Sequence, residues 1–352
     1  MEDKIKKIIA IAVNAPSGDN MQPWRFALTD QMLDLYNIPT GDTSPYNMRQ
    51  RGSLIAHGAV LENIDIVAPT FGLQSSVQLF PTPDDKTHIA HISFTEVSSR
   101  IHPFAATIEQ RCTNRLPYDK IPLTDKTTQA LDIAVGSLKS LSLSWVREND
   151  EKDELGRILS LNERLILENE KIHDAIFSII RWTNEDEQAT NDGLFIKTLE
   201  LAPPQRFAFR IFSNWRRLSK IRKLINVGKL VSKDTAKLYA SSGAFGLFTI
   251  DDESDTTFVT LGRALERLWL TATNMGLSIQ PVTALPYLYQ RIKAGDANFL
   301  SLEQQREIEN AAKAIRMFFH VPQTHTTAFL FRIGVCRVQP SARSRKRAPF
   351  IV

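Results

Sequence analysis

Hydrophobic and polar positions in the first hundred residues follow helical and strand spacing in turn. Isoleucines near the N-terminus recur at helical intervals with lysines on the opposite face, which predicts an amphipathic helix. A longer apolar stretch predicts a buried helix that ends at Gly72, and Pro69 predicts a kink or an early end in its last turns. In order, the predicted elements are a helix at 4–14, strands at 24–29 and 32–36, a helix at 53–73 and a strand at 88–95.

The pattern restarts after residue 100 with longer connections. Residues 58–63 and 262–267 open two similar apolar stretches, and in each the first glycine precedes a Gly-Leu pair by fourteen residues. A chance match between two apolar helices is the alternative, but the strand-helix-strand order is repeated as well. The predicted elements are helices at 107–111 and 124–135, a strand at 141–146, a broken helical segment at 154–183, a strand at 243–250, helices at 261–277 and 302–319, and a strand at 327–335.

This repetition predicts an α+β fold of two degenerate copies of one unit, each with an antiparallel or mixed sheet flanked by helices. The first unit covers 1–100 and the second 101–352, with an insertion near 184–240. The insertion mixes aromatic side chains with arginines and lysines. Such a composition is typical of an amphipathic helix packed on the body, a lid over an anionic ligand, or a membrane or nucleic-acid surface. Because no nucleic-acid-binding motif accompanies the charge, we expect no nucleic-acid partner.

Composition narrows the class of protein without identifying it. The chain has 352 residues, of which 43% are hydrophobic and 23% charged, so it can bury a sizeable core. Its formal charge of +4 is mild, and no apolar run approaches the roughly 18 residues of a membrane span, so we expect no integral membrane association. The acidic start of the chain does not resemble a signal peptide, and the two cysteines lie far apart. We therefore expect a cytoplasmic protein without a metal site.

A tight polar loop joins the first predicted helix to the first strand. Residues 15–26 are Ala-Pro-Ser-Gly-Asp-Asn-Met-Gln-Pro-Trp-Arg-Phe, and the two prolines, the glycine and the Asp-Asn pair exclude regular structure. Ser17, Asn20 and Gln22 then offer hydrogen-bonding groups from a rigid frame, which suits a ligand with a polar edge. A simple capping turn is the alternative, since these residues are common turn formers.

A second polar segment suits a phosphate. Residues 111–118 are Arg-Cys-Thr-Asn-Arg-Leu-Pro-Tyr, in which two arginines flank a hydroxyl and an amide. Guanidinium groups donate two parallel hydrogen bonds to phosphate oxygens, and the neutral groups can add further donors. Two arginines solvated at a helix end are the alternative explanation.

Together these segments resemble the FMN-dependent nitroreductase superfamily, and in particular its long, internally duplicated, Acg-like branch of NAD(P)H nitroreductases. The loop is similar to the signature A-P-S-x-x-N-x-Q-P-W-x-F, and residues 111–118 are similar to the segment R-x-T-N-R-x-P-F of the long branch. Residues 276–283 are similar to the family's Gly-Leu loop, whose backbone faces the flavin ring. Arginines near the C-terminus lie where family members place a further phosphate-binding cation.

The resemblance implies a set of FMN-binding residues. The loop at 16–22 would hold the ring edge and the ribityl chain, the arginine segment would hold the phosphate, and the backbone at 280–282 would face the ring. The sequence alone does not decide which of the three C-terminal arginines would bind the phosphate. The implied cofactor-binding residues are Pro16, Ser17, Asn20, Gln22, Arg111, Thr113, Asn114, Arg115, Gln280, Pro281, Val282, Arg343, Arg345 and Arg347.

The resemblance also explains the duplication. Short nitroreductases are homodimers whose flavin sites take residues from both subunits. This chain has one complete set, because its first copy supplies the loop and its second copy supplies the arginine segment, the Gly-Leu loop and the C-terminal cations. No arginine motif precedes Lys4, and 135–144 holds no Pro-Ser-x-x-Asn string. We therefore expect a fused pseudo-dimer with one FMN site per chain, either monomeric or a loose homodimer.

The implied activity is transfer of electrons from NAD(P)H through the flavin to a small electron-poor acceptor, such as a nitroaromatic or a quinone, in a ping-pong cycle. The flavin would carry the chemistry, so no side chain need act as a catalytic acid or base. The alternative is a weakly active or inactive protein that binds or sequesters flavin, with the insertion closed over the site.

Overall fold

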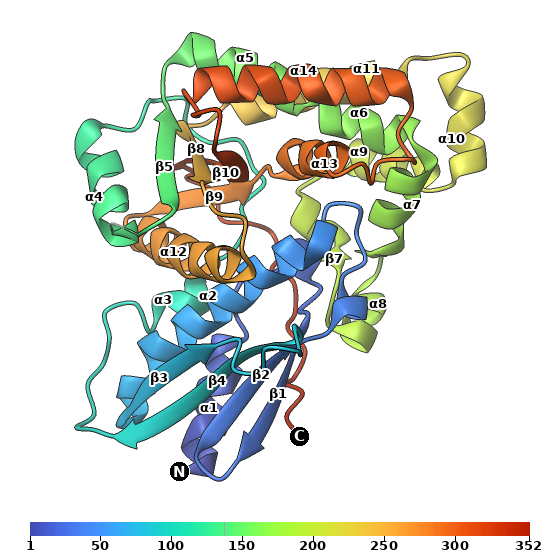
Figure 1. The fold of residues 1–352 in the computed structure, drawn as a ribbon. Coiled ribbons are helices and arrows are strands. Elements are labelled where there is room, and N and C mark those ends of the chain that lie inside the picture. The colour runs from blue at the N-terminus through green and yellow to red at the C-terminus, as the bar shows by residue number, and fades with distance from the viewer. Residues whose placement is uncertain (137) are drawn as a thin grey trace.

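The computed structural model describes residues 1–136 and 138–352 and contains two four-stranded antiparallel sheets (Figure 1). The first sheet has the order β1-β2-β4-β3, and the second has the order β5-β8-β10-β9. The strands of the first sheet are β1 (Trp24–Thr29), β2 (Met32–Asn37), β3 (Leu73–Leu79) and β4 (His88–Glu96). Those of the second are β5 (Leu141–Val146), β8 (Ala244–Ile250), β9 (Leu277–Pro281) and β10 (Thr326–Val335).

Both sheets are built from the same succession of elements. In each, a long helix separates the second strand from the third, α2 (Arg51–Val67) in the first unit and α12 (Asp255–Asn274) in the second. The series β1, β2, α2, β3, β4 therefore corresponds to β5, β8, α12, β9, β10, and the strand order matches. The predicted α+β fold of two tandem units is confirmed.

The two long helices cross at the glycines that the sequence comparison matched. A Cβ atom built on Gly58 would overlap the carbonyl oxygen of Val259, and one built on Gly262 would overlap the carbonyl oxygen of Ile55. Only glycine allows this approach of two backbones. Apolar side chains from both units, among them Phe26 and Phe248, belong to one continuous core. The units are therefore halves of one folded body.

Equivalent strands differ in their connections. A tight turn joins β1 to β2, whereas residues 147–243 separate β5 from β8, a longer segment that includes the predicted insertion at 184–240. Its helices are α5 (Asn149–Leu159), α6 (Leu161–Glu168), α7 (Glu170–Ser178), α8 (Asn184–Thr190), α9 (Pro203–Phe212), α10 (Trp215–Arg222) and α11 (Val227–Ala240), with the short parallel pair β6 (Ile180–Arg181) and β7 (Leu194–Phe195). Between β9 and β10 lie α13 (Ala284–Lys293) and α14 (Leu302–Phe318).

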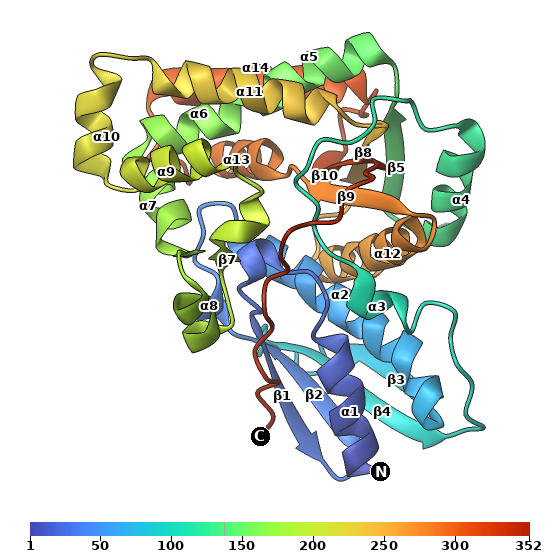
Figure 2. The ribbon, with the colours of Figure 1, turned by 180° about the vertical axis from the view of Figure 1, so that it is seen from behind.

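The C-terminal tail, residues 336–352, crosses from the second unit to the first (Figure 2). It leaves β10 and ends beside β1, where the N–H groups of Phe26 and Leu28 donate to the carbonyl oxygens of Phe350 and Val352 at 2.9 Å. The N–H of Val352 donates back to Phe26 at 3.0 Å. The end of the chain thus covers the free edge of β1.

Several elements differ from the predictions. The helix predicted at 53–73 ends at Val67 and continues as a 3-10 turn (Ala68–Phe71) that contains Pro69, and β3, which follows, was missed. Residues 277–281, expected as a loop, form β9 because they pair with β10 along its edge. The remaining helices are α1 (Glu2–Ala12), α3 (Thr107–Gln110) and α4 (Asp125–Val135). Among the described residues, no helix is long and apolar enough to cross a membrane.

Candidate functional site

The loop between α1 and β1 has a strained backbone. Asp19, Asn20 and Gln22 have φ angles of 48°, 60° and 53°. These angles lie in the left-handed region, which residues other than glycine rarely adopt. Each such residue costs on the order of 1 kcal/mol and persists only where its surroundings hold it. One internal restraint is the hydroxyl of Ser17, which accepts a hydrogen bond from the N–H of Gln22 at 3.1 Å.

The C-terminal tail supplies further restraints on this loop. The side-chain amide of Asn20 donates to the carbonyl oxygen of Arg345 at 2.9 Å, and the N–H of Arg347 donates to Oε1 of Gln22 at 2.8 Å. The guanidinium of Arg347 also donates to the carbonyl oxygen of Met21 at 3.1 Å. The polar groups of Asn20 and Gln22 that the sequence assigned to a ligand therefore hold the tail in this structure.

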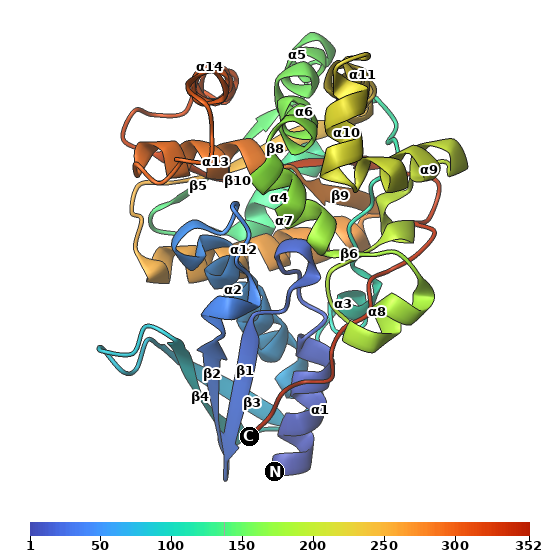
Figure 3. The same ribbon diagram turned by 90° about the vertical axis from the view of Figure 1, so that its right-hand side faces the viewer.

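The segment around α8 lies beside the same loop (Figure 3). Nε2 of Gln22 donates to the carbonyl oxygen of Asn191 at 2.8 Å, and Arg347 pairs with Asp192 at 2.6 Å. Glu187, which is buried on α8, accepts the N–H of Arg345 at 2.9 Å. Loop, tail and insertion thus form one hydrogen-bonded layer, drawn from three distant parts of the sequence.

Arg111 is buried and has protein partners. Its guanidinium donates to the carbonyl oxygen of Asn14 at 2.8 Å, stacks on the Trp269 ring at 4.7 Å, and lies 3.6 Å from a carboxylate oxygen of Glu266. Burial raises the pKa of Glu266 to about 7, against the opposing charge of Arg111. Lys346, which sequence reasoning did not select, donates to the carbonyl oxygen of Ala15 at 2.9 Å. Burial and the nearby Arg111 lower the pKa of Lys346 to about 7.

Arg115, like Arg111, donates one side-chain hydrogen bond within the described residues. One N–H donates to the carbonyl oxygen of Thr198 at 3.1 Å, and among the described residues its other N–H groups have no protein acceptor. Burial lowers its pKa, while the nearby carboxylate of Asp19 acts in the opposite direction. A partly buried guanidinium whose unused donors remain accessible favours a bound anion.

Residues 113–114 lie along β9. Thr113 forms a parallel bridge with Ile279, and the side-chain amide of Asn114 donates to the hydroxyl of Ser278 at 3.1 Å. This contact brings the arginine segment next to 280–282, as the resemblance implies. The polar groups there are already engaged, however. Oε1 of Gln280 accepts from the buried Arg332 at 2.8 Å.

The backbone next to Gln280 offers few donors. The N–H of Val282 donates to the carbonyl oxygen of Leu330 at 2.8 Å, and Pro281 has no N–H. This pair can present only carbonyl oxygens to a ligand.

The three C-terminal arginines that the sequence left open are separated by the structure. Arg343 donates to the carbonyl oxygen of Glu109 at 2.6 Å, outside the loop contacts. Arg345 lies 3.8 Å from Glu187, and Arg347 pairs with Asp192. All three guanidinium groups contact protein acceptors. The amine of the neighbouring Lys346 instead lies close to the buried charges of Arg111 and Glu266.

Buried acids and tyrosines were missed by sequence reasoning. The hydroxyl of Tyr239 donates to Glu163 at 2.9 Å, and the second carboxylate oxygen of Glu163 has no partner among the described residues. Burial raises the pKa of Glu163 to about 7. The hydroxyl of Tyr46, whose pKa the charge of Glu163 also raises, donates to Asn162 at 2.8 Å. These groups belong to no motif, and three of them come from the 147–243 segment, so only the fold could bring them together.

Asp42 adds another buried acid close to the loop. Burial and the nearby Asp19 raise its pKa to about 6, against a hydrogen bond of 3.0 Å from the N–H of Ser44. Asp19, whose pKa burial also raises, faces Arg115. The charges of Asp19 in the predicted loop and Arg115 in the arginine segment therefore attract each other. Asp19 was not among the predicted site residues.

Comparisons with known proteins give curated relatives but no family model that matches the chain. The chain is 26% identical over 289 residues to "Uncharacterized protein MT1398" of Mycobacterium tuberculosis and 29% identical over 195 residues to "Putative NAD(P)H nitroreductase acg" of the same species. Another "Putative NAD(P)H nitroreductase", Rv3131, is 23% identical over 80% of this chain and 76% of its own. The chain is thus similar to two proteins named as putative NAD(P)H nitroreductases.

The coverage of these relatives is incomplete. The alignment with MT1398 spans 80% of this chain but only 38% of that protein. The alignment with Acg spans 54% of this chain and 57% of that protein. The chain therefore covers less than two thirds of either. Among solved structures, the FMN-dependent nitroreductase NfnB of Mycobacterium smegmatis in complex with NADPH matches with a TM-score of 0.37 and 12% identity, over 66% of this chain and 86% of that one. The resemblance predicted from the motifs is confirmed by the curated relatives.

Proposed function

We propose that this protein is an FMN-dependent oxidoreductase that passes electrons from NAD(P)H to a small electron-poor acceptor, such as a nitroaromatic or a quinone. The nitroreductase-type relatives support this class of activity. The observation that carries it to a site is Arg115, whose unused donors are accessible to a ligand and which is close enough to Asp19 of the strained loop to feel its charge.

The residues around Arg115 fit FMN in their chemistry. The phosphate needs cationic and neutral donors, and the hydroxyls of Thr113 and Ser17 can add to the guanidinium of Arg115. A ribityl chain and a ring edge need polar partners, which the loop supplies. When bound, FMN would supply the hydride and electron transfer chemistry.

The chain's own residues would bind, shape and shield the site. Arg115 would bind the phosphate. Arg111 would support the loop through its hydrogen bond to the carbonyl oxygen of Asn14. Asn20 and Gln22 would act mainly by keeping the loop in its strained shape, because their amides hold the tail and the α8 segment. Glu163, with a pKa near 7, would be partly protonated near neutral pH.

We propose one such site per chain, formed between the unit at 1–100 and the unit at 101–352. The first supplies the loop, and the second supplies Arg115, β9 and the tail. This division makes the chain a pseudo-dimer, so the site does not require a second chain.

A second candidate is a protein that binds flavin but turns over slowly. The observation that favours it is the closed layer of Gln22, Asn191, Asp192 and Arg347, which restricts access to the loop. In this case flavin would bind tightly, and reduction by NAD(P)H would be slow.

Absorbance spectroscopy tests both candidates. Purified protein incubated with FMN and desalted should be yellow, bleach on addition of NADPH, and recover its colour on addition of a quinone. Colour without bleaching would favour the flavin-sequestering candidate. Protein that stays colourless after incubation with FMN would overturn the oxidoreductase proposal and its alternative together.

A further inference from the structure

Residues 201–237, called here the basic arm, carry a strong local charge that the flavin proposal does not use. The arm has ten basic residues and a single acidic one, Asp234, although the whole chain carries only +4. Eight of the ten are exposed, and among the described residues none of the ten pairs with a carboxylate within 4.0 Å. The ten are Arg206, Arg210, Arg216, Arg217, Lys220, Arg222, Lys223, Lys229, Lys233 and Lys237.

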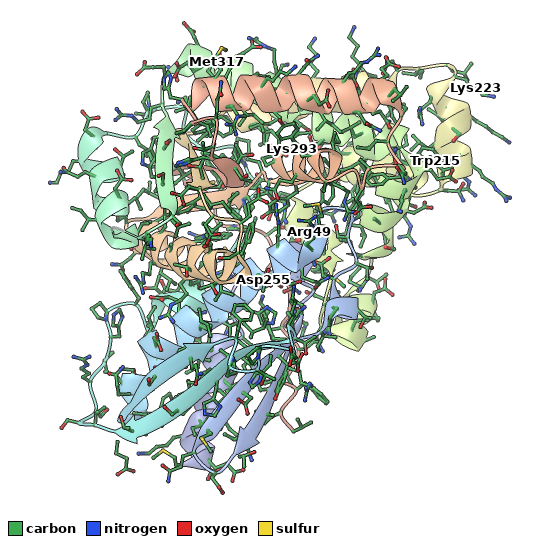
Figure 4. All side chains as sticks on the ribbon, in the orientation of Figure 1. Arg49, Trp215, Lys223, Asp255, Lys293 and Met317 are labelled. Atoms are coloured by element: carbon green, nitrogen blue, oxygen red, sulfur yellow. The ribbon has the colours of Figure 1, made fainter. Side chains whose placement is uncertain are left out.

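The fold of the arm turns these charges outward. Leu218 of α10 and Val227 of α11 are buried against Leu167 of α6, with Trp215 packed beside them. Figure 4 shows Trp215 near the body of the protein and Lys223 at the outer end of α10. Trp215 and Phe212 thus help to anchor the arm, whereas Phe207 on α9 is 71% exposed. The hydrogen bonds of residues 187–198 go to Gln22 of the loop, Arg115 of the arginine segment and Arg345 of the tail.

The outer end of the arm also exposes aliphatic side chains. Leu224 is 87% exposed and Ile225 is 53% exposed in the turn between α10 and α11, and Leu230 on the next helical turn is 58% exposed. Figures 1 and 2 place this turn at a corner of the molecule. Exposed leucine and isoleucine set among unpaired lysines and arginines are typical of surfaces that bind at a membrane interface.

We propose that the basic arm binds the surface of an anionic phospholipid bilayer, with Leu224 and Ile225 inserted among the lipid chains. The lysines and arginines would face the headgroup phosphates, and the aliphatic tip would leave water. Charge alone would equally suit a nucleic acid. Nucleic acids, however, stack on exposed aromatic rings. The rings of Trp215 and Phe212 pack inward, the exposed ring of Phe207 lies on α9 and not at the tip, and the tip itself is aliphatic.

This proposal is independent of the flavin site, because the arm's tip makes no contact with the strained loop. It describes peripheral attachment by a few side chains and one turn of backbone. If the arm does not bind membranes, the oxidoreductase proposal still stands. If the protein is not an oxidoreductase, the membrane proposal still stands.

Vesicle sedimentation tests the proposal with the full-length protein. Wild-type protein should bind vesicles of equimolar phosphatidylcholine and phosphatidylglycerol, and should bind phosphatidylcholine vesicles at least about tenfold more weakly. Salt at about 0.5 M should weaken the binding, since it screens the headgroup charges. The double variants Leu224→Glu/Ile225→Glu and Lys220→Glu/Lys223→Glu should each lower the partition coefficient at least about tenfold.

Matched variants on other faces serve as controls. Ile121→Glu/Ile133→Glu changes two isoleucines that are 71% and 73% exposed near α4, and Lys7→Glu/Lys126→Glu reverses two exposed lysines outside the arm. Both controls should bind vesicles within about twofold of wild type.

Insertion has its own measurement. Brominated lipid should quench the added fluorescence of an Ile225→Trp variant, which adsorption by charge alone would not produce. The proposal is overturned if the Leu224→Glu/Ile225→Glu variant binds vesicles like wild type, or if the two lipid compositions bind equally. It is also overturned if single-stranded RNA binds wild type more tightly than the anionic vesicles do at the same salt concentration.

Discussion

At the scale of single residues, the two arginines of one motif have different surroundings. Arg111 is enclosed by Asn14, Trp269 and Glu266, so its removal would leave a buried carboxylate without its nearest cation. Arg115 donates to Thr198 and keeps its other donors unused. The motif predicts phosphate binding by both. We propose a mainly structural role for Arg111, which lies against the Glu266 carboxylate and the Trp269 ring, and a binding role for Arg115.

We expect Arg115→Ala to weaken FMN binding at least about tenfold while changing the free energy of unfolding by less than about 1 kcal/mol. Arg111→Ala should instead lower the free energy of unfolding by about 3 kcal/mol, because it breaks a buried pair. Fluorescence titration with FMN and urea unfolding measure the two quantities. The double variant Arg111→Met/Glu266→Leu should regain much of the stability, and the assignment is wrong if Arg115→Ala binds FMN like wild type.

The buried Glu163 makes stability depend on pH. Burial raises its pKa from 4.5 to about 7, so the folded protein holds more protons than the unfolded chain between these values. Its contribution to the free energy of unfolding therefore falls as the pH rises through this window and is level above it. Asn162, Tyr46 and Tyr239 surround the carboxylate and fix its environment.

Glu163→Gln should keep the hydrogen bond from Tyr239 without the buried charge. We expect it to be more stable than wild type at pH 8 by up to about 3 kcal/mol and equal to it near pH 4.5. Urea unfolding at several pH values measures this difference. A variant that is less stable than wild type at pH 8 would contradict the assignment.

At the scale of elements, the local sequence pattern predicted some strands, whereas others form only because they pair with a neighbouring strand. Strands 24–29 and 141–146 were predicted at their observed bounds, because each is a short apolar run between clear turn signals. β3 and β9 were missed because both follow a helix-ending glycine directly and carry many polar positions. Their hydrogen bonds to β4 and β10 make them strands. The helix crossing was present in the sequence only as two matched glycines.

Gly262→Ala tests that crossing. The substitution favours an isolated helix by roughly 1 kcal/mol, but here the new methyl group meets the backbone of α2 at Ile55. We expect a net loss of about 2 kcal/mol or more in the free energy of unfolding, measured in urea. Gly52→Ala, whose Cβ would come no closer than 3.1 Å to a side-chain oxygen of Asn47, should change stability much less. Equal effects from both would contradict the close crossing.

At the scale of the whole molecule, two units share one core and one candidate site. The loop comes from the first unit, the arginines from the second, and the tail returns from the second unit to the first sheet. A bond such as that between Asn20 and Arg345 joins residues 325 positions apart. We propose that the reciprocal site has been lost, because residues 135–144 of the second copy hold no Pro-Ser-x-x-Asn string.

Titration calorimetry with FMN should therefore give a stoichiometry of one flavin per chain. The physical reason is that a second site would need another polar loop and another arginine segment, and the sequence contains one of each. A molar ratio of two would contradict the single composite site. Ser17→Ala should lower the affinity without changing the ratio.

The sequence by itself determined the repeated helices and strands, the polar loop and the arginine segment, because spacing and turn chemistry are local properties. It also indicated the family, through motifs of fixed spacing. Only the tertiary structure decided which polar groups are free and which are engaged. The contacts of Lys346 and the pairing of Glu163 with Tyr239 could not be predicted from the sequence. The basic arm is held to the body by Leu218, Val227 and Trp215, which pack inward. Hydrogen-bond partners and burial depend on contacts across hundreds of residues, which no local pattern records.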